Sequence, residues 1–258
     1  MATKLLPIIR ADARSQLSEI VPMLERGNLG REGQIYDLVI QNYRVVGICG
    51  LLHDGSSSEF LTNLQKSGSA CAFLLPKLND DNSATSKLQG FFASAACGDE
   101  EAARTISSKS RDSWNPELEH EDDFIFVRLL MDLFYRGASE SDLMALANRL
   151  GEVTEGEVSP RREICQALLT KSSERFGEGL EEYILERRDY YAEQWDADYI
   201  LEEEWATDGQ IFVEGIALVR MARKLGLDTQ AEYLFIPSLV LDRDAENRSP
   251  DSWRAVTF

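Results

Sequence analysis

Histidine and cysteine are scarce in this sequence, and their scarcity limits the metal chemistry that the chain can support. The 258 residues include two histidines and four cysteines. Glu117 and His120 form one Glu-x-x-His pattern on a stretch expected to be helical, whereas a di-iron bundle needs that pattern twice. The cysteines are widely spaced among apolar residues, so we expect them to be reduced and buried: Cys49, Cys71, Cys97 and Cys165. We predict no metal and no cofactor.

The sequence also lacks the motifs of common enzymes. It contains no Gly-x-x-x-x-Gly-Lys phosphate loop and no Gly-x-Ser-x-Gly elbow. The adjacent acids Asp122 and Asp123, or Glu181 and Glu182, could serve as acid and base. Paired acids are common in a region this acidic, which favours a solvated surface, and we predict that the chain is not an enzyme.

Long apolar runs are missing as well. No stretch of about 18 consecutive apolar residues occurs, which argues against a membrane span. The N-terminus has a short apolar patch without a hydrophobic region and cleavage site of the kind that direct secretion. We therefore expect a cytoplasmic protein that does not contact membranes.

Basic residues are in short supply in one part of the chain. The net charge is −18, and the segment from Gly98 to Asp208 alone holds 29 acidic and 12 basic residues. Such a field repels nucleic acid and attracts basic partners. The alternative is that the charge only keeps the surface solvated.

Apolar residues recur at helical spacing along most of the chain. The strongest pattern joins Ile211, Gly215, Leu218, Ala222 and Leu225 on one face of a helix, with Glu214, Arg220 and Lys224 on the other side. We expect a capping box between Thr207 and Gln210, a stop at Gly226, and a second helical arm from Tyr233 to Leu241 that closes a hairpin.

Further helices are expected near residues 12–27, where Pro22 would bend the helix, and near 34–53, 64–78, 88–98, 99–106, 117–137, 139–150 and 160–206. No alternating strand pattern appears, so the prediction is an all-α fold of about ten helices, arranged as stacked antiparallel hairpins in one bundle or short solenoid.

The domain organisation is predicted to be simple. We expect one domain over residues 1–258, with the Ser-rich link at 107–116 as the best place for a subdivision. Residues 242–258 lose periodicity and are expected to form a surface tail held by Trp253 or Phe258.

Carboxylates form a stripe within the most polar helical stretch. Five of them follow one another at steps of four and three residues: Glu182, Glu186, Asp189, Glu193 and Asp196. Adjacent like charges weaken a helix by roughly 0.2–0.5 kcal/mol per pair, so the stripe does not serve local stability. The predicted partner-binding surface combines the stripe with nearby acids and with two aromatic residues that could anchor a partner if they are exposed. Its other members are Glu119, Glu121, Asp122, Asp123, Tyr190, Trp195, Glu202 and Glu203, and the acids extend to Asp198 and Glu204.

Two stretches carry a resemblance to a known family. The first is Tyr36-x₆-Tyr43-x₃-Gly47-x₃-Leu51-Leu52-x-Asp54-Gly55, followed by Phe60-x₃-Leu64 and Ala70-x₂-Phe73-Leu74. The second comprises Gly215-Ile-Ala-Leu, Met221-Ala-Arg-Lys-Leu-Gly226 and Ile236-Pro237-Ser-Leu239. Together they resemble the N-terminal and C-terminal parts of immunity protein 49 family members. A second helical immunity group, built of two consecutive domains of unknown function, ends in a similar way.

The resemblance implies an all-α cytoplasmic protein that binds and neutralises a cognate bacterial toxin domain. The acidic stripe would then face a basic toxin surface. Two alternatives stay open from the residues alone. One is a helical-repeat adaptor with an endogenous partner, and the other is a carboxylate-based hydrolase or metal enzyme.

Overall fold

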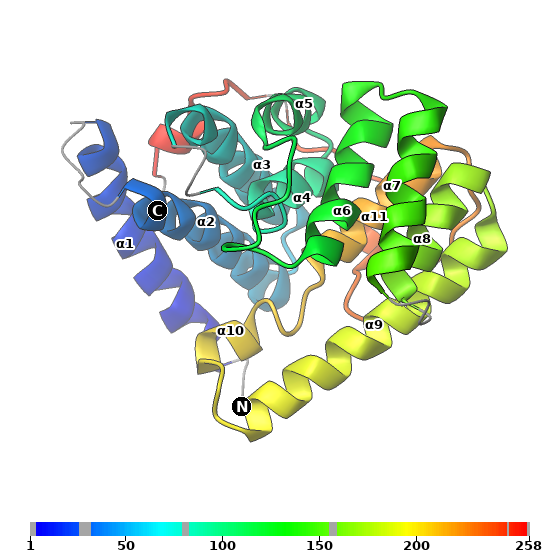
Figure 1. The fold of residues 1–258 in the computed structure, drawn as a ribbon. Helices are drawn as coiled ribbons and strands as arrows, with labels where there is room; N and C mark the ends of the chain where they lie inside the picture. The colour runs from blue at the N-terminus through cyan, green and yellow to red at the C-terminus, as the bar shows by residue number, and fades with distance from the viewer. Residues whose placement is uncertain (1–3, 26–31, 79–82, 155–158, 247, 257–258) are drawn as a thin grey trace.

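Helices build nearly all of the regular structure (Figure 1). The computed structural model describes residues 4–25, 32–78, 83–154, 159–246 and 248–256. Within these ranges it contains eleven α-helices and no strand, apart from one isolated bridge between Tyr233 and Ile236. The helices are α1 Leu6–Glu25, α2 Glu32–Asp54, α3 Ser57–Leu74, α4 Gln89–Cys97, α5 Glu100–Lys109, α6 Glu121–Met131, α7 Glu140–Val153, α8 Pro160–Thr170, α9 Ser173–Asp196, α10 Glu202–Ala206 and α11 Val213–Lys224. The all-α prediction is confirmed.

The first half of the chain packs around the hairpin of α2 and α3, which make the most extensive helix pair in the molecule. Ser56 caps α3 by accepting a hydrogen bond from the backbone N–H of Glu59. α4 lies close against α3, because Gly90 leaves no room for a side chain: a Cβ there would lie 2.2 Å from the Cβ of Cys71. Glycine at this contact lets the two helices approach each other.

α2 is unusually apolar. The segment Ile35–Asp54 has a mean hydropathy of 1.2 and is long and apolar enough to cross a membrane, so the expectation that no segment qualifies was too strict. Within the protein, 72% of this segment is buried. Packing against α1 and α3 accounts for its composition.

α11 lies in the interior and packs against α4. Its buried residues surround the helix rather than forming one face, and they include Gly215, Ile216, Leu218, Val219 and Ala222. Gly226 ends the segment in the left-handed conformation, as predicted.

Two details of this segment differ from the prediction. Thr207 donates a hydrogen bond to the carbonyl oxygen of Glu203, so it forms no capping box, and α11 begins at Val213. The second arm of the expected closing hairpin is not helical beyond the 3₁₀ turn Ser238–Val240. Phe235 has a positive φ of 61°, and Pro237 cannot donate the backbone hydrogen bond that a helix interior needs.

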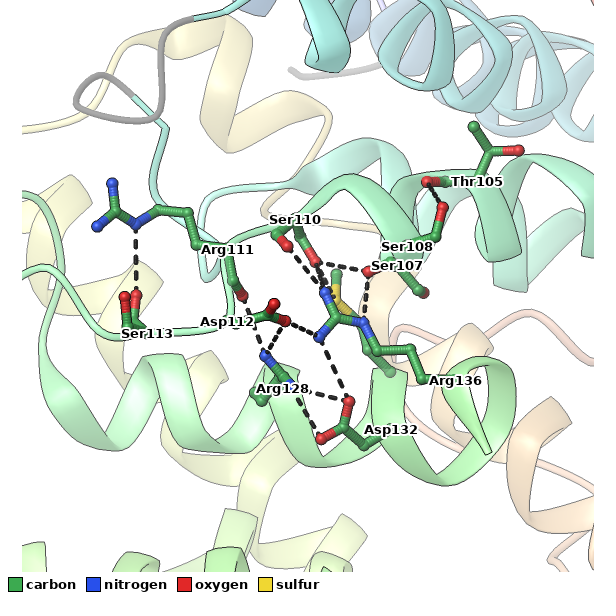
Figure 2. A network of polar contacts seen from close by, with 11 residues as sticks. Thr105, Ser107, Ser108, Ser110, Arg111, Asp112, Ser113, Arg128, Asp132 and Arg136 are labelled. Carbon is green, nitrogen blue, oxygen red and sulfur yellow. Dashed lines mark hydrogen bonds and ion pairs between the residues drawn. The ribbon is translucent and has the colours of Figure 1, made fainter. Parts of the chain in front are cut away.

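The Ser-rich link at 107–116 is bound to the helices that follow it (Figure 2). α5 extends into the link as far as Lys109. Arg136 donates to the backbone and side-chain oxygens of Ser110 at 2.8 Å, and both Arg136 and Arg128 reach the carboxylate of Asp112 at 2.7 Å. Arg128 also pairs with the buried Asp132, in the π-helical turn Asp132–Arg136. These contacts join the link to α6.

The last residues pack onto the α2–α3 hairpin. Trp253 is fully buried, and Tyr43 donates a hydrogen bond to its carbonyl oxygen. The buried Lys66 donates to the carbonyl oxygen of Ala255 at 2.6 Å. Trp253 therefore fixes this segment, and Phe258 lies outside the described residues.

Candidate partner-binding surface

α9 is fixed to the bundle by its N-terminal half. Ser172 accepts a hydrogen bond from the backbone N–H of Arg175 and begins the helix. Phe176, Leu180 and Ile184 are buried, and Gly179 allows close contact with α8, because a Cβ there would meet the Cβ of Glu163 at 3.1 Å. α8 and α9 form one of the extensive helix pairs.

Beyond Ile184 the helix continues along the lower edge of the molecule in Figure 1. Every residue from Leu185 to Trp205 is exposed or partly exposed. The exposed part of α9 extends for roughly 18 Å at the helical rise per residue. This half of α9 is therefore available to a partner.

The five carboxylates of the predicted stripe are all exposed and lie on the outer side of α9; we call them the acidic face. Among the described residues, only Asp189 of the five has an ion-pair partner, the neighbouring Arg188 at 2.7 Å. Partial desolvation raises the pKa of Glu186, an effect that the charge of Arg161 opposes and that of Glu182 reinforces. The other four carboxylates of the acidic face thus carry charge that no ion pair within the described residues neutralises.

Arg187 holds the inner side of the C-terminal half of α9 against the rest of the protein. Its guanidinium lies over the rings of Tyr191 and Phe212, at 4.5 and 4.8 Å from their centroids. It also donates to the carbonyl oxygens of Asp208 and Ile211. Burial lowers the pKa of Arg187, although nearby acids act in the opposite direction. These contacts hold α9 against the segment before α11 and give the acidic face a fixed orientation.

The two aromatic candidates are exposed, as the prediction required. Tyr190 is 53% exposed and Trp195 is 36% exposed. Trp195 stacks on Trp205 of α10, so one face of its ring is already covered. Tyr190 contacts Tyr191 edge to face and leaves most of its surface free.

The predicted acids near the start of α6 occupy different environments. Glu119 is buried and accepts a hydrogen bond from the backbone N–H of Ser86 at 2.7 Å, so it lies off the surface. Glu121 pairs with Arg149 through two hydrogen bonds of 2.8 and 3.0 Å, and Asp123 pairs with Arg161. Residues 116–118 form a turn and α6 begins at Glu121, so Glu117 and His120 do not share the helix that was expected for them.

Asp122 lies beside the acidic face. It lines a hollow of about 740 Å³ together with Glu186 and Tyr190. The structure therefore brings one acid of the α6 start together with α9, although the two elements are far apart in the sequence. Of the α10 acids, Glu202 is exposed and Glu203 is half-buried. Burial, together with the negative charges of Asp12 and Asp208, raises the pKa of Glu203.

A polar network beneath this surface was not predicted. Arg161 donates to the hydroxyl of Tyr183 at 2.9 Å, and this hydroxyl donates to Glu214 at 2.8 Å. With Asp123, these groups connect α6, α8, α9 and α11. Burial raises the pKa of Glu214, and Arg161 partly offsets the effect. The four residues are far apart in the sequence, and no local pattern identifies them.

Sequence reasoning also missed three exposed apolar residues near the acidic face. Leu185, Tyr199 and Leu201 are 43%, 79% and 76% exposed. Across the described residues, no group of three or more His, Cys, Asp or Glu side chains is arranged to hold a metal ion. All four cysteines are free and buried, as expected.

The architecture defines a class: all-α proteins built as a helical bundle, here with an exposed charged face on α9. The chain belongs to the immunity protein 49 family, whose model matches residues 50–239. The matched range includes all of α9 and α10, so the acidic face lies within the family domain. No curated protein and no solved structure matches the chain. Its role is that of an immunity protein.

Proposed function

We propose that this immunity protein binds a toxin domain directly in the cytoplasm and covers a basic surface of it with the acidic face of α9. The observation that carries the proposal is the exposed row of carboxylates from Glu182 to Asp196, of which only Asp189 is paired within the described residues. The net charge of −18 makes nucleic acid and anionic membranes unfavourable partners. A basic protein fits this charge distribution.

A largely unpaired acidic face of this kind acts mainly on the rate of association. Unneutralised carboxylates on a fixed helix attract a positive surface before contact and orient it, which raises the association rate more than the final affinity. Exposed charges are screened within about 10 Å at 0.1 M salt, so the effect weakens as the salt concentration rises. Arg187 and the Trp195–Trp205 stack keep the acidic face in place, so binding costs little conformational entropy there.

The test is a charge reversal with a matched control. The cognate toxin domain, sought among the genes that adjoin this one, is purified as an inactive variant, and its binding is measured by surface plasmon resonance at several salt concentrations. Glu186→Lys, Asp189→Lys and Glu193→Lys together should lower the association rate about 10-fold to 100-fold at low salt and abolish most of its salt dependence. The control, Glu19→Lys, Glu101→Lys and Glu140→Lys, changes the net charge equally at exposed positions on α1, α5 and α7.

The control separates local charge from total charge. If both triple variants slow association equally, the long-range field of the whole molecule is responsible and the acidic face is not the docking site. If neither variant changes the rate, the electrostatic proposal is wrong. Failure of the wild-type chain to bind the neighbouring toxin domain would contradict direct inhibition.

A further inference from the structure

Apolar side chains concentrate where the acidic face ends. Of the twelve exposed large hydrophobic residues in the described parts of the chain, five lie between Leu185 and Leu201. Tyr199 and Leu201, in the link between α9 and α10, are the most exposed of all twelve, at 79% and 76%. Single exposed hydrophobic residues are ordinary, but two side chains as exposed as Tyr199 and Leu201 on one short link indicate an interaction site. In Figure 1 the link runs upward from the lower end of α9 to α10.

The backbone holds Tyr199 in a defined position. The N–H of Tyr199 bonds to the carbonyl oxygen of Gln194 at 2.9 Å, and the N–H of Asp198 bonds to that of Trp195 at 3.1 Å. Asp198 adopts the left-handed conformation with φ of 56°. This hydrogen-bond pattern is the Schellman motif, in which the residue at the position of Tyr199 usually packs back on the helix. Here its side chain is left in solvent.

The backbone of Leu201 is also held by a hydrogen bond. Its carbonyl oxygen accepts the hydrogen bond of the Trp205 N–H at 3.0 Å, which starts α10. Trp205 in turn stacks on Trp195. Both apolar side chains therefore project from an ordered turn, and a partner that buries them does not have to order the backbone first.

Three exposed carboxylates surround this turn: Asp196, Asp198 and Glu202. A second copy of this chain would bring like charges together there, and an anionic lipid surface would be repelled. A basic protein surface with an apolar depression would attract these carboxylates and bury the two exposed apolar side chains. Interfaces of this kind take most of their binding energy from a few anchors that are surrounded by polar contacts.

We infer that Tyr199 and Leu201 are the apolar anchors of the toxin interface and that they insert into a depression bordered by basic residues of the toxin. This inference rests on the proposed function and adds to it a division of tasks. The acidic face governs the approach of the partner, and the anchors govern how long the complex lasts.

The experiment compares two pairs of exposed apolar residues in the full chain. Tyr199→Ser with Leu201→Ser is set against Leu234→Ser with Leu239→Ser, whose side chains are 53% and 45% exposed elsewhere on the surface. Circular dichroism and thermal unfolding should be unchanged in both, because none of these side chains is buried. The first pair should raise the dissociation rate of the inactive toxin domain at least about 30-fold and leave the salt dependence of association intact. The second pair should do neither.

Each outcome decides between the alternatives. Unchanged dissociation in the Tyr199 and Leu201 variant, in a complex that still depends on the acidic face, would overturn the anchors and leave the proposed function standing. If the Tyr199 and Leu201 substitutions instead remove the salt dependence of association and leave the dissociation rate unchanged, the anchors are likewise overturned and the proposed function stands. If sedimentation shows a wild-type dimer that the Tyr199 and Leu201 substitutions dissociate, the occupant is a second copy and the inference is wrong. A wild-type chain that does not bind the toxin domain refutes both proposals.

Discussion

The indole rings of Trp195 and Trp205 stack with their centroids 5.4 Å apart and their planes 19° apart. One ring belongs to the last turn of α9 and the other to α10, so the contact closes the link that carries Tyr199 and Leu201. Every residue from Leu185 to Trp205 is at least partly exposed, and this stack is one of the contacts that hold the segment together.

Removal of one indole should loosen the link without unfolding the bundle. Trp205→Ala is expected to speed amide hydrogen exchange in residues 198–206 while the buried helices α2, α3 and α11 keep their protection. A double-mutant cycle with Trp195→Ala should give a coupling of about 0.5–1.5 kcal/mol, the usual range for aromatic pairs. Tyr199→Ala serves as the control, since its exposed ring should not affect exchange in α10. A coupling near zero would mean that the stack does not support the link.

Arg44 and Asp208 form the best-buried ion pair joining α2 to the segment before α11. Their side chains are 11% and 10% exposed, the atoms are 2.7 Å apart, and Gln41 donates to the same carboxylate at 2.7 Å. Asp208→Ala should lower the free energy of unfolding by about 3 kcal/mol, because it leaves the guanidinium of Arg44 without its charged partner. Glu121→Ala, which breaks the more exposed pair with Arg149, should cost much less. Urea denaturation of both variants measures the difference, and equal losses would contradict this explanation.

The buried cysteines should make stability fall at alkaline pH. Burial raises the pKa of Cys71 and Cys97 to about 12, from an ordinary value of 9.0. A raised pKa means that the folded state disfavours the thiolate. The stability that this contributes is complete below about pH 9 and is lost as the pH rises toward 12. The pKa of buried Tyr43 is raised for the same reason and acts in the same direction.

The urea midpoint should therefore stay constant from about pH 7 to 8.5 and fall above about pH 9. Cys71→Ala with Cys97→Ala should make this fall shallower. At pH 8 a thiol reagent should leave the folded protein unlabelled and label four cysteines in urea. Fast labelling of the native protein would show that the thiols are accessible.

Much of the fold could be predicted because its signals are local. The spacing of apolar residues located most helices, and glycines such as Gly98 and Gly137 end helices in the left-handed conformation. Steps of four and three residues also predicted that the carboxylates of α9 form a stripe on one side of the helix, and the structure has all five exposed.

What escaped prediction depends on contacts between distant residues. Glu214 was expected on the side of its helix away from the apolar face, yet Tyr183 and Arg161 hold it in a part-buried network. Thr207 and Gln210 match a capping box in sequence, but both bind backbone carbonyl oxygens of the preceding helix instead. Tyr199 and Leu201 fit no helical pattern, and their exposure is a property of the folded turn rather than of the local sequence.

The separation of interior from surface along α9 has a consequence for how such a protein can change over generations. Substitutions between Leu185 and Trp205 remove no fully enclosed side chain. If this segment is the docking site, as proposed, its exposed positions can change to match an altered toxin while the bundle keeps its fold.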